Sequence, residues 1–283
     1  MSTDTLREIL DELGRADEVA VAERLKASAC DLAALLADLP GDDGALNRER
    51  VADLLDASSE ACESFLTVAL PTVEYAEHAA FTQLPQAVRH ITRATAAANT
   101  EQTARRVAAV PAVGRVVWAL TAYALHCDRP GAIGTLASAR VEIPFRDEFV
   151  PVPALISLRY PDALEGNAGH AFDTYLQWLV GLQLLERYPL FGSDIEAALL
   201  EADLVLAMFA AQYYAGGEIY SRGHDKHTVR RFAARVEDER QREPLTELFR
   251  GEGTLEDRLE RAYSAVHGDR RRFDTGPATL FQR

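Results

Sequence analysis

Helical periodicity dominates this sequence of 283 residues. In segment after segment, apolar residues recur three and four positions apart, which is the spacing that lines one face of an α-helix. One such stripe consists of Leu6, Ile9, Leu10 and Leu13, and another runs through residues 172–182. The pattern predicts a mainly all-α fold, organised as a multi-helix bundle.

One predicted helix is apolar on almost every side. It follows a capping box at residues 193–196, in which a serine and a glutamate satisfy the first backbone amides of a helix. A helix without a polar face must be enclosed by other elements. We therefore predict that it forms the core of the bundle. Its apolar residues are Ile195, Leu199, Leu200, Leu204, Leu206, Met208 and Phe209.

The centre of the chain departs from the helical pattern. Between residues 140 and 160, β-branched side chains alternate with polar ones, and prolines stand at positions 144, 151 and 153. Alternation indicates a strand, and proline excludes a helix interior. The sequence predicts one short central β-hairpin or extended segment around residues 140–160. Elsewhere, Pro71, Pro85 and Pro111 are each predicted in the first turn of a helix.

Charge divides the chain into blocks. The net charge is −14, and residues 1–80 carry 18 acidic and 6 basic side chains, whereas residues 81–138 carry 2 acidic and 6 basic ones. We predict an acidic N-terminal helical region over residues 1–82 and a larger helical domain over residues 83–283. The chain has 28 arginines and two lysines, so a GC-rich genome or a salt-rich cytoplasm is an alternative origin of the acidity.

A short pattern occurs twice in the acidic region. The order Val-Ala-acid-x-Leu-x-Ala-Ser occupies residues 21–28 and returns at residues 51–58, and a leucine follows each copy, Leu36 and Leu66. The spacing over residues 21–36 and 51–66 resembles a helix-turn-helix, in which the serine caps the second helix. Cys30 and Cys62, where each copy turns inward, are predicted to be small buried side chains.

The second helix of each copy carries the wrong charge for DNA. Asp31 and Asp38 lie on the first and Glu60 and Glu63 on the second, without Arg or Lys. Phosphates repel carboxylates, so these helices are poorly suited to a DNA groove. A helical hairpin repeat, or a motif that binds protein, is the alternative to DNA binding.

A basic block follows the acidic region. Arg89 and Arg93 are one helical turn apart, and Arg105, Arg106 and Arg115 come next. We predict that Arg89, Arg93, Arg105 and Arg106 contact a partner or a phosphate group. The alternative is that the basic block faces the acidic region of the same chain.

Two predicted loops contain histidines beside carboxylates. If the loops are adjacent, their side chains form a candidate site for a divalent metal. The alternative is that these loop residues are solvated or cap helices. The candidates are His170, Asp173, His224, Asp225 and His227.

No motif for a common cofactor or nucleophile is present in the sequence. We therefore predict no cofactor and no catalytic residue, and a non-catalytic interaction or regulatory protein, an adaptor or inhibitor that binds a protein partner through charged helical surfaces. A DNA-binding transcriptional regulator and a metal-dependent hydrolase are the alternatives. The first residues lack the order of a signal peptide, and no apolar stretch is long enough to span a membrane, so a cytoplasmic location is expected.

Overall fold

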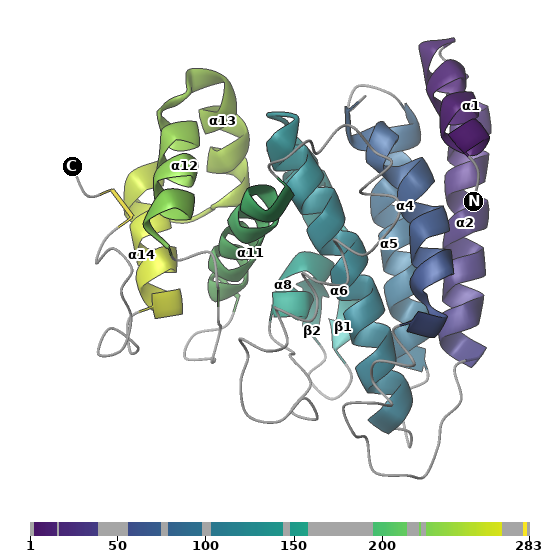
Figure 1. The fold of residues 1–283 in the computed structure, drawn as a ribbon. Coiled ribbons are helices and arrows are strands. Elements are labelled where there is room, and N and C mark those ends of the chain that lie inside the picture. Colours follow the sequence, from purple (N-terminus) through teal and green to yellow (C-terminus); the bar gives the residue numbers. More distant parts are fainter. Residues whose placement is uncertain are drawn as a thin grey trace.

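The computed structural model (Figure 1) describes residues 3–15, 17–38, 56–74, 79–97, 103–143, 148–157, 195–213, 221, 225–267 and 280–281. Within these ranges the chain forms eleven helices and one antiparallel pair of strands. The prediction of a mainly all-α bundle with a short hairpin is therefore confirmed. The predicted stripe over residues 172–182 lies outside the described residues.

The elements have the following bounds: α1 Thr3–Gly14, α2 Glu18–Asp38, α4 Ser59–Glu74, α5 Ala79–Ala97, α6 Thr103–His126, α7 Gly131–Ala137, β1 Arg140–Ile143, β2 Glu148–Pro151, α8 Val152–Ser157, α11 Ile195–Ala211, α12 Lys226–Glu237, α13 Glu239–Leu248 and α14 Leu255–His267.

Most of the helices stand side by side in a row (Figure 1). α2 packs against α4 and α5, α4 packs against α6, α6 packs against α11, and α11 packs against α12 and α14. The pair α1 and α2 thus forms one end of the row, and α12, α13 and α14 form the other. The two ends of the molecule are therefore separate surfaces.

Two helices occupy the middle of the row and carry the core. Every residue from 112 to 125 of α6 is buried, and so is every residue from 201 to 210 of α11. The prediction that the all-round apolar helix forms the core is confirmed, and α6 shares that role. No helix in the described ranges has the length and apolar character that crossing a bilayer requires.

The hairpin follows the predicted alternation. Val141 pairs with Val150 and both are buried, whereas Arg140 and Phe149 are exposed. One face of the pair thus packs inward, with β1 against α5. The chain does not stay extended after residue 151, because α8 begins at Val152. Pro153 is compatible with this helix because it lies in its first turn.

The first copy of the helix-turn-helix pattern is wrong as a structure. Residues 21–36 lie within α2, which continues without a break from Glu18 to Asp38. Ser28 does not cap a second helix, since its hydroxyl donates to the Leu25 carbonyl 3.1 Å away inside the same helix. The spacing of Ala22 and Leu25 suits a continuous helix as well as a helix-turn-helix, so the pattern alone did not distinguish these two structures.

In the second copy the serine does lie at a helix start, but other helices enclose the helix that follows. Ser58 directly precedes α4, and its carbonyl accepts the first helical bond from the Cys62 amide. Residues 51–55, which would form the preceding helix, lie outside the described residues. Every residue of α4 from Phe65 to Val73 is buried, and α4 packs against α1, α2, α5 and α6. The part of α4 from Phe65 to Val73 is therefore not accessible to a DNA groove.

Three predicted helix starts fall inside helices. Pro71 lies in the last turn of α4, Pro85 lies inside α5, and α6 continues through Pro111. Proline removes one helical hydrogen bond and crowds the preceding turn. At Pro71 the complete burial of Leu70 and Val73 offsets this cost. The domain boundary predicted after residue 82 falls inside α5, and the two-domain division stays a prediction.

Candidate functional site

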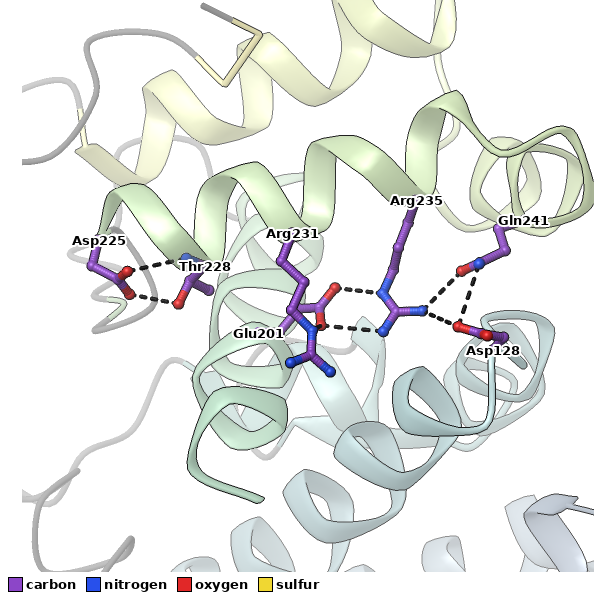
Figure 2. A network of polar contacts seen from close by, with 7 residues as sticks. All are labelled: Asp128, Glu201, Asp225, Thr228, Arg231, Arg235 and Gln241. Atoms are coloured by element: carbon purple, nitrogen blue, oxygen red, sulfur yellow. Dashed lines mark hydrogen bonds and ion pairs between the residues drawn. The ribbon is translucent and has the colours of Figure 1, made fainter. Parts of the chain in front are cut away.

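An ion-pair network around a buried glutamate joins the middle of the row to its C-terminal end (Figure 2). Glu201 on α11 is fully buried, and both of its carboxylate oxygens accept from arginines of α12. Arg235 Nε lies 2.5 Å from Glu201 Oε1, and Arg231 Nε lies 2.9 Å from Glu201 Oε2. We call Asp128, Glu201, Arg231, Arg235 and Gln241 the Glu201 network.

The other end of the Arg235 guanidinium reaches the turn after α6. Its Nη1 lies 2.5 Å from Asp128 Oδ1 and donates to Gln241 Oε1 at 3.0 Å. Asp128 has a φ of 55°, a left-handed conformation that aspartate tolerates better than most residues. Burial acts to lower the pKa of Arg235, but the hydrogen bonds and charges of Glu201 and Asp128 outweigh it and raise that pKa.

Two carboxylates face two guanidiniums in the Glu201 network, so its charges are compensated. Such an arrangement holds elements in register. The network therefore fixes α12 and the start of α13 against α11 and the α6–α7 turn. The sequence contained one signal for it, a glutamate inside an otherwise apolar helix. Arg235, however, is 34 residues from Glu201 and 107 residues from Asp128 along the chain.

Two of the predicted metal ligands can be placed, and one of them caps a helix. Asp225 precedes α12, where its Oδ1 accepts from the amides of His227 and Thr228 at 2.8 and 3.0 Å. Burial acts to raise the pKa of Asp225, but these hydrogen bonds and that from the Thr228 hydroxyl lower it. His227 is exposed. The carboxylate is thus engaged as an N-cap, as the capping alternative expected.

The rest of the predicted metal site cannot be placed. His170, Asp173 and His224 lie outside the described residues. Among the residues that are described, no group of three or more His, Cys, Asp or Glu side chains could hold a metal ion. The metal site stays a prediction.

The predicted phosphate or partner contacts lie on α5 and α6. On α5, Arg89 is half-buried and Arg93 is exposed. Neither forms an ion pair or hydrogen bond with another described residue. Arg105 and Arg106 lie near the start of α6, and their side chains lie outside the description. The role of these four arginines stays a prediction.

Arg115 shows that one arginine of the basic block faces inward. It is fully buried on α6, and its Nη1 donates to the Ser59 hydroxyl of α4 at 3.3 Å. This contact joins one arginine of the basic block to a neutral serine of α4, and the intramolecular alternative for the other arginines stays a prediction. Nearby, burial raises the pKa of the Cys62 thiol to about 11, although the Arg115 charge and a hydrogen bond with Ser58 act to lower it.

The buried thiol makes stability sensitive to alkaline pH. A cysteine in an unfolded chain has a pKa of about 8.5, below that of folded Cys62. The stabilisation is therefore complete below about pH 8.5 and is lost as the pH rises towards 11. Between about pH 8 and pH 10.5, wild type should lose about 2–3 kcal/mol more free energy of unfolding than Cys62→Ala.

Urea unfolding followed by circular dichroism at the two pH values measures this difference. Tyr123, whose pKa burial also raises, is present in both proteins, so its contribution cancels in the comparison. Equal pH dependence of wild type and Cys62→Ala would show that Cys62 is not protected from water.

Ion pairs also fasten α1 to α2. Arg24 on α2 contacts Glu12 and Glu8 of α1, with its Nη2 2.9 Å from Glu12 Oε1 and 3.3 Å from Glu8 Oε2. The hydrogen bond that Arg24 donates to Glu12 is the main cause of a raised Arg24 pKa, and burial acts to lower that pKa by less. Two acidic side chains of the N-terminal region therefore form ion pairs within the chain.

The remaining face of α2 points away from the row. We call its exposed residues the α2 stripe. Three acidic side chains, one lysine, three small residues and Val19 make it up, and Val19 is 70% exposed. Cys30 is among them, so the prediction that it is buried is wrong. The members are Val19, Glu23, Lys26, Ala27, Cys30, Asp31, Ala34 and Asp38.

No protein-family model, curated protein or solved structure matches this chain. Its fold and surface chemistry are therefore the basis for a functional assignment.

Proposed function

We propose that this chain is a non-catalytic helical interaction protein, an adaptor or inhibitor that binds a basic protein partner through the α2 stripe. The observation that carries the proposal is the composition of that stripe at a free end of the row. Three acidic side chains lie along it among small or apolar ones and one lysine, and two acidic residues of α1 near it are already paired with Arg24.

The small residues of the stripe suit a helical partner. Interhelical distance depends on the side chains at the contact, so Ala27, Cys30 and Ala34 allow another helix to approach closely. Val19 then supplies apolar area that is exposed in the free protein.

The acidic residues of the stripe select the charge of the partner. Glu23, Asp31 and Asp38 are spaced along about four turns of one face of α2. A partner helix with Lys or Arg at matching intervals is complementary to them. Such complementarity raises association rates and excludes partners of the wrong charge.

Fewer observations support the two alternative functions, DNA binding and metal-dependent hydrolysis. DNA binding through a recognition helix has no support in α2 or α4, so phosphate contacts would depend on Arg89 and Arg93. Metal-dependent hydrolysis depends on residues outside the described ranges. Both stay predictions.

Charge reversal on the stripe should weaken partner capture. In the variant Glu23→Lys, Asp31→Lys, Asp38→Lys, like charges face each other in the complex, and we expect affinity to fall about tenfold or more. The measurement is capture of partners from native lysate at about 0.1 M salt and again at about 0.5 M salt, where screening is stronger. A photo-crosslinker on the exposed thiol of Cys30 in the otherwise wild-type chain identifies what contacts the stripe.

The matched control reverses three exposed acidic residues at the other end of the row, Glu239→Lys, Glu243→Lys and Glu247→Lys on α13. This control changes net charge equally and should retain the partner. If both triple variants capture the same proteins at equal yield, or if Cys30 crosslinks to none of them, the α2 stripe is not the binding surface.

A further inference from the structure

The C-terminal residues Leu280 and Phe281 rest against α12 and α14, the last helices of the row. Leu280 is 3% exposed, and Phe281 is half-buried against the core. The Leu280 amide donates to the Glu260 carboxylate of α14, at 2.9 Å from Oε2 and 3.2 Å from Oε1. Of the described residues in this segment, the Leu280 amide and the two apolar side chains contact the helices.

The pair does not fill the space in which it lies. A pocket of about 380 Å³ remains beside it, lined by Leu280 and Phe281 together with residues of α12 and α14. Val236 contributes apolar surface, and Arg230, Glu237 and Glu256 contribute charged groups. We call this surface, with Glu260, the α12–α14 groove.

The groove has the parts of a short-peptide site. Proteins bind extended segments through hydrogen bonds to the backbone of the segment and through pockets for its side chains. The groove offers both, because Glu260 accepts from a backbone amide and space for apolar side chains lies beside it. Among the described residues of this segment, Leu280 and Phe281 make the contact, and a competing segment that carries the same kind of pair offers the same contacts. Glu256, on the groove wall, forms an ion pair with Arg242, whose Nη1 lies 2.7 Å from Glu256 Oε1.

We propose that the α12–α14 groove is a docking site for an extended segment of a partner protein that carries an aliphatic–aromatic pair, and that the chain's own Leu280–Phe281 pair occupies it at rest. The resting pair defines the chemistry of the partner: an aliphatic residue whose amide meets Glu260, followed by an aromatic residue. The groove and the α2 stripe lie at opposite ends of the row, so this proposal does not depend on the proposed function.

The test measures binding of a fluorescent peptide to the full chain. The peptide has the sequence of residues 276–283 of this protein. In wild type the resting pair competes with it, and in the variant Leu280→Asp, Phe281→Asp the groove is vacant. If the groove is occupied about nine-tenths of the time at rest, fluorescence anisotropy should show binding about tenfold tighter in the variant.

Adding Glu260→Ala to that variant should abolish the gain, and a peptide with serine in place of both apolar residues should not bind. The α2 charge-reversal variant is the matched control, and its peptide affinity should equal that of wild type. Leu280→Ala is a milder release variant in case the double aspartate chain does not fold, and it should show a smaller gain of the same sign.

Three results would overturn the proposal. The first is equal affinity of the peptide for wild type and both release variants, and the second is no binding at peptide concentrations up to about 1 mM. The third is a wild-type dimer that the release variants lack, because the Leu280–Phe281 pair would then sit in the groove of a second copy.

Discussion

Replacing Arg235 by methionine is expected to lower the free energy of unfolding by about 3–5 kcal/mol, since it strands a buried charge. Glu201 is fully buried and would keep only Arg231 as a charged partner. Asp128 and Gln241 would lose their contact with Arg235 as well. Urea unfolding followed by circular dichroism at neutral pH measures the loss.

Two further variants separate the buried charge from packing. Arg231→Met removes the more exposed guanidinium and one contact, so it should cost roughly 1–2 kcal/mol. In Glu201→Met combined with Arg235→Met, no buried carboxylate is stranded, and most of the lost stability should return. A loss below about 1 kcal/mol in Arg235→Met, or a double variant less stable than either single variant, would show that the Glu201 network does not fasten α12 to α11.

Replacing Phe65 by alanine should be about as costly, at about 3–5 kcal/mol. Phe65 is fully buried on α4, which other helices enclose on several sides, so the surroundings can collapse only partly into the space left behind. Phe65→Leu retains most of the volume and should cost less than about 1.5 kcal/mol.

Glu60→Ala is the matched control on the same helix, because Glu60 is exposed, and it should change stability by less than about 0.5 kcal/mol. An effect of Phe65→Ala as small as that of Glu60→Ala would mean that α4 presents its apolar face to solvent or to a partner. That result would restore the helix-turn-helix interpretation of residues 51–66.

The strongest periodic signals in the sequence predicted the fold correctly. A helix without a polar face, residues 201–210, lies where no water reaches it. Val141 and Val150 alternate with exposed residues because a strand pair has two faces and only one packs inward. In both cases a local pattern reports burial directly, so no knowledge of distant partners is needed.

Local signals failed where packing between distant segments decides the structure. Pro71 and Pro111 are helix-starting residues by local preference, but burial of the residues around them keeps α4 and α6 continuous. The serine of residues 21–28 satisfies its hydroxyl inside α2, so the same residue type marks a helix start in one copy and a helix interior in the other.

The candidate surfaces were less predictable than the fold. The acidic character of the N-terminal region is visible in the sequence, but which of its carboxylates are paired depends on Arg24, which forms ion pairs with Glu8 and Glu12 of α1. Glu260 gave no signal, because its contact with Leu280 depends on a segment 20 residues away.

The linear order of the helices gives the molecule two well-separated faces with different chemistry, one acidic and one built around α12 and α14. A molecule of this shape can hold two ligands at once without steric conflict. Two ligands bound at the two ends are held at a fixed separation, so the effective concentration of one near the other depends on the length of the row. A protein of this kind raises the encounter rate of its two ligands without contacting the groups that react.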